Sequence, residues 1–260
     1  MGPVEHIGAR TISHLRAVGY ALGFVLEVLV QTGRFFTRRN TGSRVLTMQV
    51  LFTGVEALSV VSIISLGIGA VIIIQGLSLL PQFGQGQLIY SILIIVITRE
   101  LGPILTALIV TARSGTAIAT ELGNMVINQE IEAYSVTGIN PIQHIVVPRV
   151  IGVTVSTLLL NLYFNLFGLL GSFVVTQFVN PISLREYSAG LLSVLSVTDV
   201  ASSVVKSLVF GALTALVATF YGLQVERAST EIPVAAIRAV GRGITLLILA
   251  NAVITFAYYL

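Results

Sequence analysis

Long apolar runs dominate the chain, and the charged residues stand between them. Four stretches contain no charged side chain, namely residues 57–98, 150–184, 207–225 and 243–260. A helix needs about 20 mostly apolar residues to cross the hydrocarbon core of a bilayer. The first stretch is long enough to contain one whole helix and much of a second. The pattern therefore predicts five spanning helices, at residues 56–80, 88–112, 147–176, 200–222 and 241–260.

The region before the first run has a different pattern. Apolar residues recur there at alternating steps of three and four, at Leu15, Val18, Leu22, Val25 and Leu29. This periodicity predicts an amphipathic helix over 5–33 that lies in the membrane interface. A sixth, poorly apolar spanning helix is the alternative. The arginines at 34–44 would bind anionic headgroups or simply fix the topology.

Composition agrees with a membrane protein. Only 10% of the 260 residues are charged, against roughly 25% in soluble domains, and the mean hydropathy is +0.96. The chain has no cysteine, which excludes disulfides and thiolate metal ligands. The predicted fold is one all-α polytopic membrane domain over 1–260, with an interfacial helix and basic segment at 5–44 and a transmembrane region at 56–260.

The arginines and lysines between the predicted spans are distributed unequally. Counting Arg149 and Arg242 at the ends of the third and fifth spans, eleven lie on one side of the membrane and one, Arg185, lies on the other. Short loops rich in Arg and Lys remain in the cytoplasm. The N-terminus is therefore predicted to be cytoplasmic and the C-terminus to lie on the far side.

Arg99 and Glu100 interrupt the second predicted span at its centre. A charged side chain at mid-bilayer costs at least about 2.5–3.5 kcal/mol on insertion scales. Adjacent side chains on a helix point about 100° apart, so each of the two needs its own partner or a water-filled cavity. Gly102 and Pro103 follow and loosen the helix. The pair either lines a substrate cavity or forms a structural ion pair between helices.

Other polar positions in the spans have two readings each. Lys206 either holds an anionic headgroup or extends its ammonium to the interface. Gln75 and Asn251 contact lipid or form interhelical hydrogen bonds, as do the amides Asn161 and Asn165. An apolar face at the outer end of the first span serves lipid contact, packing or a binding pocket, and comprises Ile72, Leu79, Leu80 and Phe83.

The segment 121–141 lies between the second and third spans and is acidic. Its apolar residues fall at helical intervals, and Gly138 and Pro141 then end the helix. A short helix with an apolar face suits a groove on a cytoplasmic partner. The alternative is a surface helix that is stabilised by the membrane.

Several catalytic motifs are absent from the sequence. It contains no GxxxxGK[ST] loop, no GxSxG turn and no HExxH pair. ATP binding through a P-loop is therefore excluded, and an intramembrane hydrolase is poorly supported. No internal repeat is visible, which counts against many secondary transporters. We expect no metal, no cofactor in this chain and no nucleic-acid partner.

Five short runs together resemble the MlaE family of ABC transporter permeases. They are Arg-Glu-Leu-Gly-Pro at 99–103, Ala-Arg-Ser-Gly at 112–115, Glu-Leu-Gly at 121–123, Gln-Glu-Ile-Glu-Ala at 129–133 and Gly-Ile-Asn-Pro at 138–141. The resemblance covers essentially the whole chain. It implies a homodimeric permease of the bacterial inner membrane that moves phospholipids to or from the outer envelope and holds them in an outward-facing cavity between the two copies.

The resemblance also implies partners. They are cytoplasmic ATPase subunits that bind ATP and Mg²⁺, a periplasmic MCE-domain protein and a small STAS-domain subunit. The ATPase would bind a coupling helix around 124–137, through Asn128, Gln129, Glu130, Ile131, Glu132, Tyr134, Gly138 and Pro141.

The resemblance places lipid-binding residues as well. Arg99, Glu100 and Lys206 match family positions in the lipid pocket. Some members carry an aspartate where this chain has Asn251, so the role of that position stays open.

Two other classes of function remain as alternatives. A secondary transporter or channel would use Arg99 and Glu100 as a gate and would depend on an ion gradient. An intramembrane enzyme would change the chemistry of its lipid.

Overall fold

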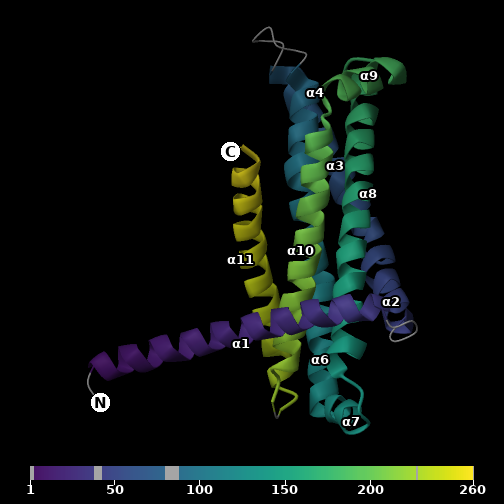
Figure 1. The fold of residues 1–260 in the computed structure, drawn as a ribbon. Coiled ribbons are helices and arrows are strands. Elements are labelled where there is room, and N and C mark those ends of the chain that lie inside the picture. Colours follow the sequence, from purple (N-terminus) through teal and green to yellow (C-terminus); the bar gives the residue numbers. More distant parts are fainter. Residues whose placement is uncertain (1–2, 38–42, 80–87, 227, 260) are drawn as a thin grey trace.

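The computed structural model describes residues 3–37, 43–79, 88–226 and 228–259, and these residues form helices and turns without a strand. Five helical paths run alongside one another, and a long helix crosses them near one end (Figure 1). All five paths are long and apolar enough to span a bilayer. The prediction of an all-α polytopic membrane protein with five spans is therefore confirmed.

The first two paths are each built from several helical segments joined end to end. The first contains α2 (Ser43–Val50), the π-helix η1 (Leu51–Val55) and α3 (Leu58–Leu79). The second contains α4 (Leu88–Leu93), the π-helix η3 (Ile94–Leu101), α5 (Gly102–Val110), the π-helix η4 (Thr111–Gly115) and α6 (Thr116–Ile127). π-helical turns are rare in proteins, and those that occur are often found at functional sites. The π-helix η3 contains the Arg99–Glu100 pair.

The other three paths are more regular. The third joins the π-helix η5 (Ile142–Val146) to α8 (Val147–Val179), the fourth is α10 (Val197–Leu223) and the fifth is α11 (Glu231–Tyr259). Two short helices lie at opposite ends of the bundle, α7 (Glu130–Val136) and α9 (Leu184–Val194) (Figure 1).

Several predicted spans are shorter than the helices that the structure shows. The second path continues through α6 to Ile127 rather than ending near 112, and α11 begins at Glu231 rather than near 241. Small residues let α6 pack closely along α10. A Cβ added at Gly222, for example, would lie 2.9 Å from the backbone oxygen of Ala119. Packing against a neighbour therefore extends the helix beyond the apolar run.

The crossing helix is α1 (Pro3–Thr37), which confirms a helix over the predicted 5–33. Phe24 packs edge-on to Phe220 of α10 at 5.5 Å between ring centroids, and Val28 is buried in the core. On the opposite face Leu22, Leu26 and Leu29 are exposed. Residues at these spacings share one side of a helix, so α1 presents one apolar face to the bundle and another away from it. Its location in the membrane interface stays a prediction.

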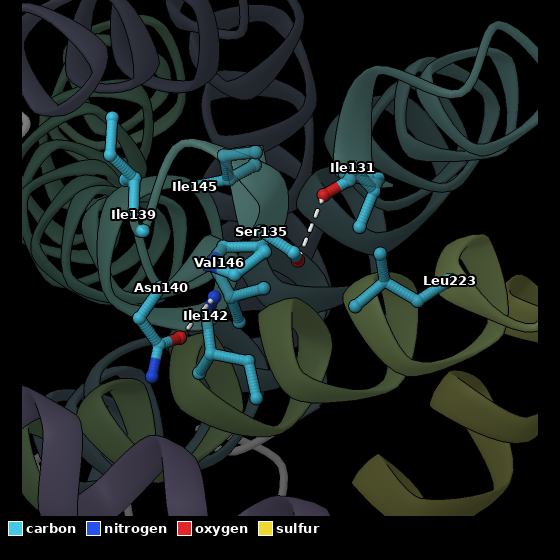
Figure 2. Close-up of a pocket in the computed structure, with 10 residues that line it drawn as sticks. Ile131, Ser135, Ile139, Asn140, Ile142, Ile145, Val146 and Leu223 are labelled. Atoms are coloured by element: carbon cyan, nitrogen blue, oxygen red, sulfur yellow. Dashed lines mark hydrogen bonds between the residues drawn. The ribbon is translucent and has the colours of Figure 1, made fainter. Parts of the chain in front are cut away.

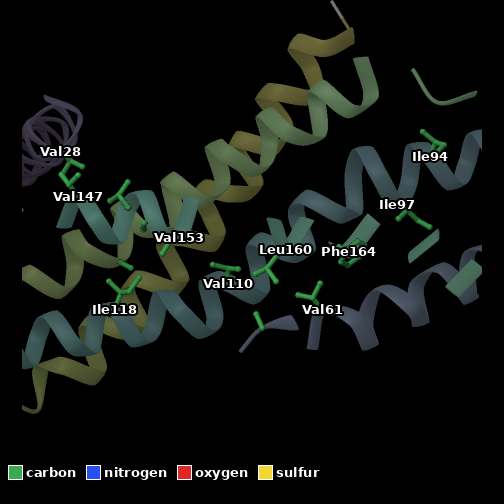
Figure 3. Packing of buried hydrophobic residues seen from close by; sticks show 14 of the residues in the cluster. Val28, Val61, Ile94, Ile97, Val110, Ile118, Val147, Val153, Leu160 and Phe164 are labelled. Atoms are coloured by element: carbon green, nitrogen blue, oxygen red, sulfur yellow. The ribbon is translucent and has the colours of Figure 1, made fainter. Parts of the chain in front are cut away.

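Close backbone contact joins α3 to α8. A Cβ added at Gly69 would lie 1.9 Å from the carbonyl oxygen of Gly168, and one at Gly171 would lie 2.6 Å from that of Leu66. Small residues let helices approach closely in membranes. Around this crossing, buried apolar side chains such as Val61, Ile97 and Phe164 form a core that follows the length of the bundle (Figure 3).

Candidate functional site

Arg99 lies in the widened turn η3 and is almost completely buried, with 6% of the residue exposed. Its Nη1 is 3.7 Å from Oδ1 of Asp199 on α10, and its Nε is 3.6 Å from Oε1 of Glu100. The ring of Tyr258 on α11 covers the guanidinium, with 4.0 Å from Cζ to the ring centroid. Three helical paths therefore surround this one cation.

Glu100 forms the second half of the network. Its Oε2 accepts a hydrogen bond of 2.8 Å from Lys206 Nζ, which also donates to the carbonyl of Arg99 at 3.2 Å. Thr255 of α11 donates to the same carboxylate oxygen at 3.4 Å. Lys206 is fully buried, whereas 29% of the Glu100 side chain is exposed. The carboxylate of Glu100 is therefore the accessible edge of an otherwise enclosed cluster.

Arg99, Glu100, Asp199 and Lys206 form a neutral ion network, with two cations and two carboxylates. Of the two outcomes predicted for the Arg99–Glu100 pair, partners or a water-filled cavity, the structure shows partners for both, Asp199 for Arg99 and Lys206 for Glu100, although the two charges also lie 3.6 Å from each other. Lys206 is enclosed rather than extended to the interface. The binding of lipid by Arg99, Glu100 and Lys206 stays a prediction.

Sequence reasoning missed three residues of this site, Asp199, Thr255 and Tyr258. Asp199 begins α10 as part of a capping box, in which Ser196 Oγ accepts from the backbone N–H of Asp199 and the carboxylate accepts from that of Ser196. The Ser-x-x-Asp pattern, with Lys206 seven residues later on the same helix face, was an available signal. Tyr258 donates to Asp199 Oδ1 at 3.4 Å, and nothing in the sequence connects these two positions.

The amides of α8 lie beside the network. Asn161 is fully buried and donates from Nδ2 to Ser203 Oγ of α10 at 2.8 Å, which confirms an interhelical hydrogen bond there. The Oδ1 atoms of Asn161 and Asn165 both face Gly102, where a Cβ would lie 2.7 Å from each. Glycine is needed after Glu100 and Leu101 because these amides approach its backbone so closely.

The remaining predicted lipid-binding residues are dispersed. Gln75 and Leu79 lie on the exposed surface of α3, whereas Ile72 packs against the core. Asn251 is partly exposed, and its Oδ1 is buried without a hydrogen-bond partner. Leu80 and Phe83 lie outside the described residues. None of the hydrogen bonds among the described residues joins Gln75 or Asn251 to the ion network, so their role stays a prediction.

The predicted coupling segment is not one helix over 124–137. α6 ends at Ile127, Asn128 leaves the helical region, and Gln129 takes a left-handed conformation with φ 59° before α7 begins. An amide residue at this turn tolerates positive φ better than a β-branched one does. As predicted, the helix ends before Gly138, which has φ 79°, and Pro141 precedes the next helix.

α7 is exposed on one side and packed on the other. Glu130, Glu132 and Val136 are exposed, and Val136 reaches 88%. Ile131 and Tyr134 pack against the core. A groove of about 500 Å³ follows α7, lined by Ile131, Ser135, residues 138–142, Ile145, Val146 and Leu223 (Figure 2). The hydrogen bond from Ile142 N–H to Asn140 Oδ1 (2.9 Å) shapes its rim.

The fold and the ion network define a helical membrane protein with paired charges inside its spans, a feature of membrane transport proteins. A sequence profile described as Permease MlaE matches residues 46–257. The chain therefore belongs to the MlaE family of permeases.

Three relatives show the extent of the similarity. A probable ABC transporter permease protein of Rickettsia felis is 26% identical over 253 residues, which cover 97% of this chain and 96% of that protein. The intermembrane phospholipid transport system permease protein MlaE of Haemophilus influenzae is 26% identical over 91% of this chain and 90% of that protein. A probable ABC transporter permease protein of Synechocystis is 30% identical over 72% of this chain and 69% of that protein.

Proposed function

We propose that this chain is the permease subunit of an ATP-driven transporter that moves phospholipids between the bacterial inner membrane and the outer envelope. The ion network carries this proposal, because ionisable residues inside spans mark substrate pathways. A headgroup phosphate can take the place of the Glu100 carboxylate beside Lys206 and Arg99, since both are anionic oxygen acceptors. Glu100 is the exposed member of the network, so this exchange needs the least rearrangement there.

The proposed transporter is a homodimer that holds its lipid in an outward-facing cavity between the copies. Val253 and Phe256 on α11 are each 67% exposed, next to the contacts that Thr255 and Tyr258 make with the network. A second copy or the acyl chains of a bound lipid would cover this apolar face. The family resemblance adds a periplasmic MCE-domain protein and a STAS-domain subunit as partners.

Lipid occupancy tests the proposed binding site. We expect Arg99→Ala and Lys206→Ala each to lower the phospholipid recovered per purified dimer several-fold, because each removes a charge-assisted contact. Glu56→Gln is the matched control, since Glu56 pairs with Arg113 away from the network. Unchanged lipid counts in both alanine variants would leave the network as a structural element only.

Energy would come from an ATPase that binds α7. We expect Glu130→Lys and Glu132→Lys to weaken the complex with the ATPase roughly tenfold each, by reversing the charge of exposed side chains at an interface. Co-purification and surface plasmon resonance measure this. Glu226→Lys is a control on another turn at the same end of the bundle. Normal ATPase binding by both α7 variants would exclude α7 as the docking helix.

Lipid transport in proteoliposomes distinguishes the proposed class from the alternatives. Movement of labelled phospholipid is expected only with the ATPase present and ATP supplied. Movement driven by an ion gradient through this chain alone would favour the secondary transporter, with Arg99 and Glu100 as its gate. Chemically altered lipid in the same vesicles would favour an enzyme.

A further inference from the structure

A second buried charge lies at the end of the bundle that carries α7. Arg149 of α8 is 5% exposed and donates from Nη1 to the carbonyl of Ile145 at 3.0 Å. Its Nη2 is 2.7 Å from Oε1 of Glu121 on α6, and its buried Nε has no hydrogen-bond partner. Buried polar groups are normally satisfied. Arg149 therefore has binding capacity that the chain itself does not use.

Two hollows meet at this arginine. One has a volume of about 510 Å³ and the other about 420 Å³, and both are lined by Val45, Glu121 and Arg149. The first is otherwise mainly apolar and includes Met48, Phe52, Ala117 and Ile118. The second adds polar groups, namely Asn124, Glu130, Tyr134 and His144. An apolar and a polar compartment with a shared wall suit an amphiphile.

The polar compartment contains groups of both charges. Arg149 supplies a cation, whereas Glu121, with 58% of its side chain exposed, and Glu130 supply carboxylates. The Nδ1 of His144 is buried there without a hydrogen-bond partner. A purely anionic ligand would be repelled by the two carboxylates. A zwitterion with a phosphate and an ammonium matches the arrangement.

The apolar compartment connects to the lipid-facing surface. Met48 is 61% exposed and Phe52 is 42% exposed, at the start of the first span. Large apolar side chains at this position face hydrocarbon in a membrane protein. A soluble polar ligand would leave this part of the hollow without a suitable occupant, whereas an acyl chain would fill it.

We propose that the two hollows bind one zwitterionic phospholipid from the leaflet on the α7 side. Its phosphate lies beside Arg149, its ammonium lies between Glu121 and Glu130, and an acyl chain packs against Met48 and Phe52. This site requires neither ATP nor transport, so it goes beyond the proposed function and can be tested separately from it. It is also separate from the Arg99 network, since it is built from α2, η1, α6, α7, η5 and α8.

The sequence provides a direct assay because the chain contains no tryptophan. The Phe52→Trp variant of the full chain places one fluorophore at the rim of the apolar hollow. It is reconstituted in vesicles of equimolar phosphatidylethanolamine and phosphatidylglycerol, in which one lipid or the other carries brominated acyl chains. Brominated phosphatidylethanolamine is expected to quench the tryptophan fluorescence about threefold more strongly than brominated phosphatidylglycerol does. One additional charge-assisted contact, partly screened, corresponds to a preference of this size.

Further variants attribute this preference to the proposed groups. In the Phe52→Trp background, Glu121→Gln and Arg149→Lys are expected to bring the two lipids to equal quenching, whereas Glu226→Gln, which alters an exposed carboxylate outside both hollows, preserves the difference. Phe178→Trp, at the opposite end of α8, is the positional control and should show no preference. Glu121→Gln alters an exposed side chain, so it keeps the test decisive even if Arg149→Lys misfolds.

Two results would overturn the proposal. The first is equal quenching by both lipids in the Phe52→Trp protein. The second is a preference that survives Glu121→Gln and a folded Arg149→Lys. If Glu121→Gln weakens ATPase binding and quenching is the same for both lipids, the region serves the ATPase and the lipid site is excluded.

Discussion

Replacing Gly69 with alanine is expected to abolish the native packing of α3 against α8. The new Cβ would lie 1.9 Å from the carbonyl oxygen of Gly168 and 2.8 Å from its carbon. Overpacking usually costs about 1–3 kcal/mol when side chains can adjust. Here the neighbour is backbone, which cannot rotate away, so the loss should exceed this range. Most of the Gly69→Ala protein should aggregate, or unfold at lower denaturant concentration, in mixed micelles.

Gly67→Ala is the matched control for this experiment. It lies two residues earlier in α3, and a Cβ there meets no atom within 4 Å. Alanine has a better helix propensity than glycine by about 0.8–1 kcal/mol, so the stability of Gly67→Ala should be unchanged or slightly raised. Similar unfolding curves for the two variants would show that α3 and α8 do not cross as closely as Gly69 and Gly168 indicate.

Replacing Lys206 with methionine is expected to destabilise the protein by about 3 kcal/mol, the usual loss when one partner of a buried ion pair is removed. Methionine preserves much of the side-chain volume, so the change acts mainly on charge. It leaves the Glu100 carboxylate without its contact of 2.8 Å and the carbonyl of Arg99 without its donor. Chemical unfolding in mixed micelles measures the difference.

A double-mutant cycle separates the ion pair from general packing. Glu100→Gln combined with Lys206→Met should be more stable than Lys206→Met alone, because no carboxylate then remains without a counter-charge. The expected coupling energy is about 1–3 kcal/mol. Additive losses would mean that Glu100 and Lys206 do not stabilise each other. Thr255→Val is a peripheral control, since its contact with Glu100 is long at 3.4 Å.

The number and order of spans could be predicted from the sequence because the bilayer imposes a simple requirement. Each spanning helix must present about 20 apolar residues, and the charge-free runs show where they lie. The helix ends could not be predicted from this requirement. α6 and the first turns of α11 extend beyond the apolar runs because they pack against α10. Small residues such as Ala119 and Gly222 permit a close approach, but they do not show which helix packs there or how far the contact extends.

The candidate site could be predicted only in part. Two adjacent charges at mid-span are costly without partners or water, so Arg99 and Glu100 could be identified from the sequence as candidate site residues. Their partners come from other helices, at Asp199, Lys206 and Tyr258. A tyrosine near the end of a span is usually an interfacial residue, so the stacking of Tyr258 on Arg99 had no signal in the sequence. The break at Gln129 was also missed, because glutamine is an ordinary helix former.

The ion network has an electrical consequence for an energised membrane. One elementary charge that crosses a potential of 100 mV exchanges about 2.3 kcal/mol with the field. Arg99 and Lys206 carry formal positive charges and Glu100 and Asp199 carry formal negative ones, so the cluster sums to zero. A rigid shift of η3 together with α10 along the membrane normal would therefore involve no net work against the voltage. The polarisation of the bilayer would neither drive such a movement nor oppose it.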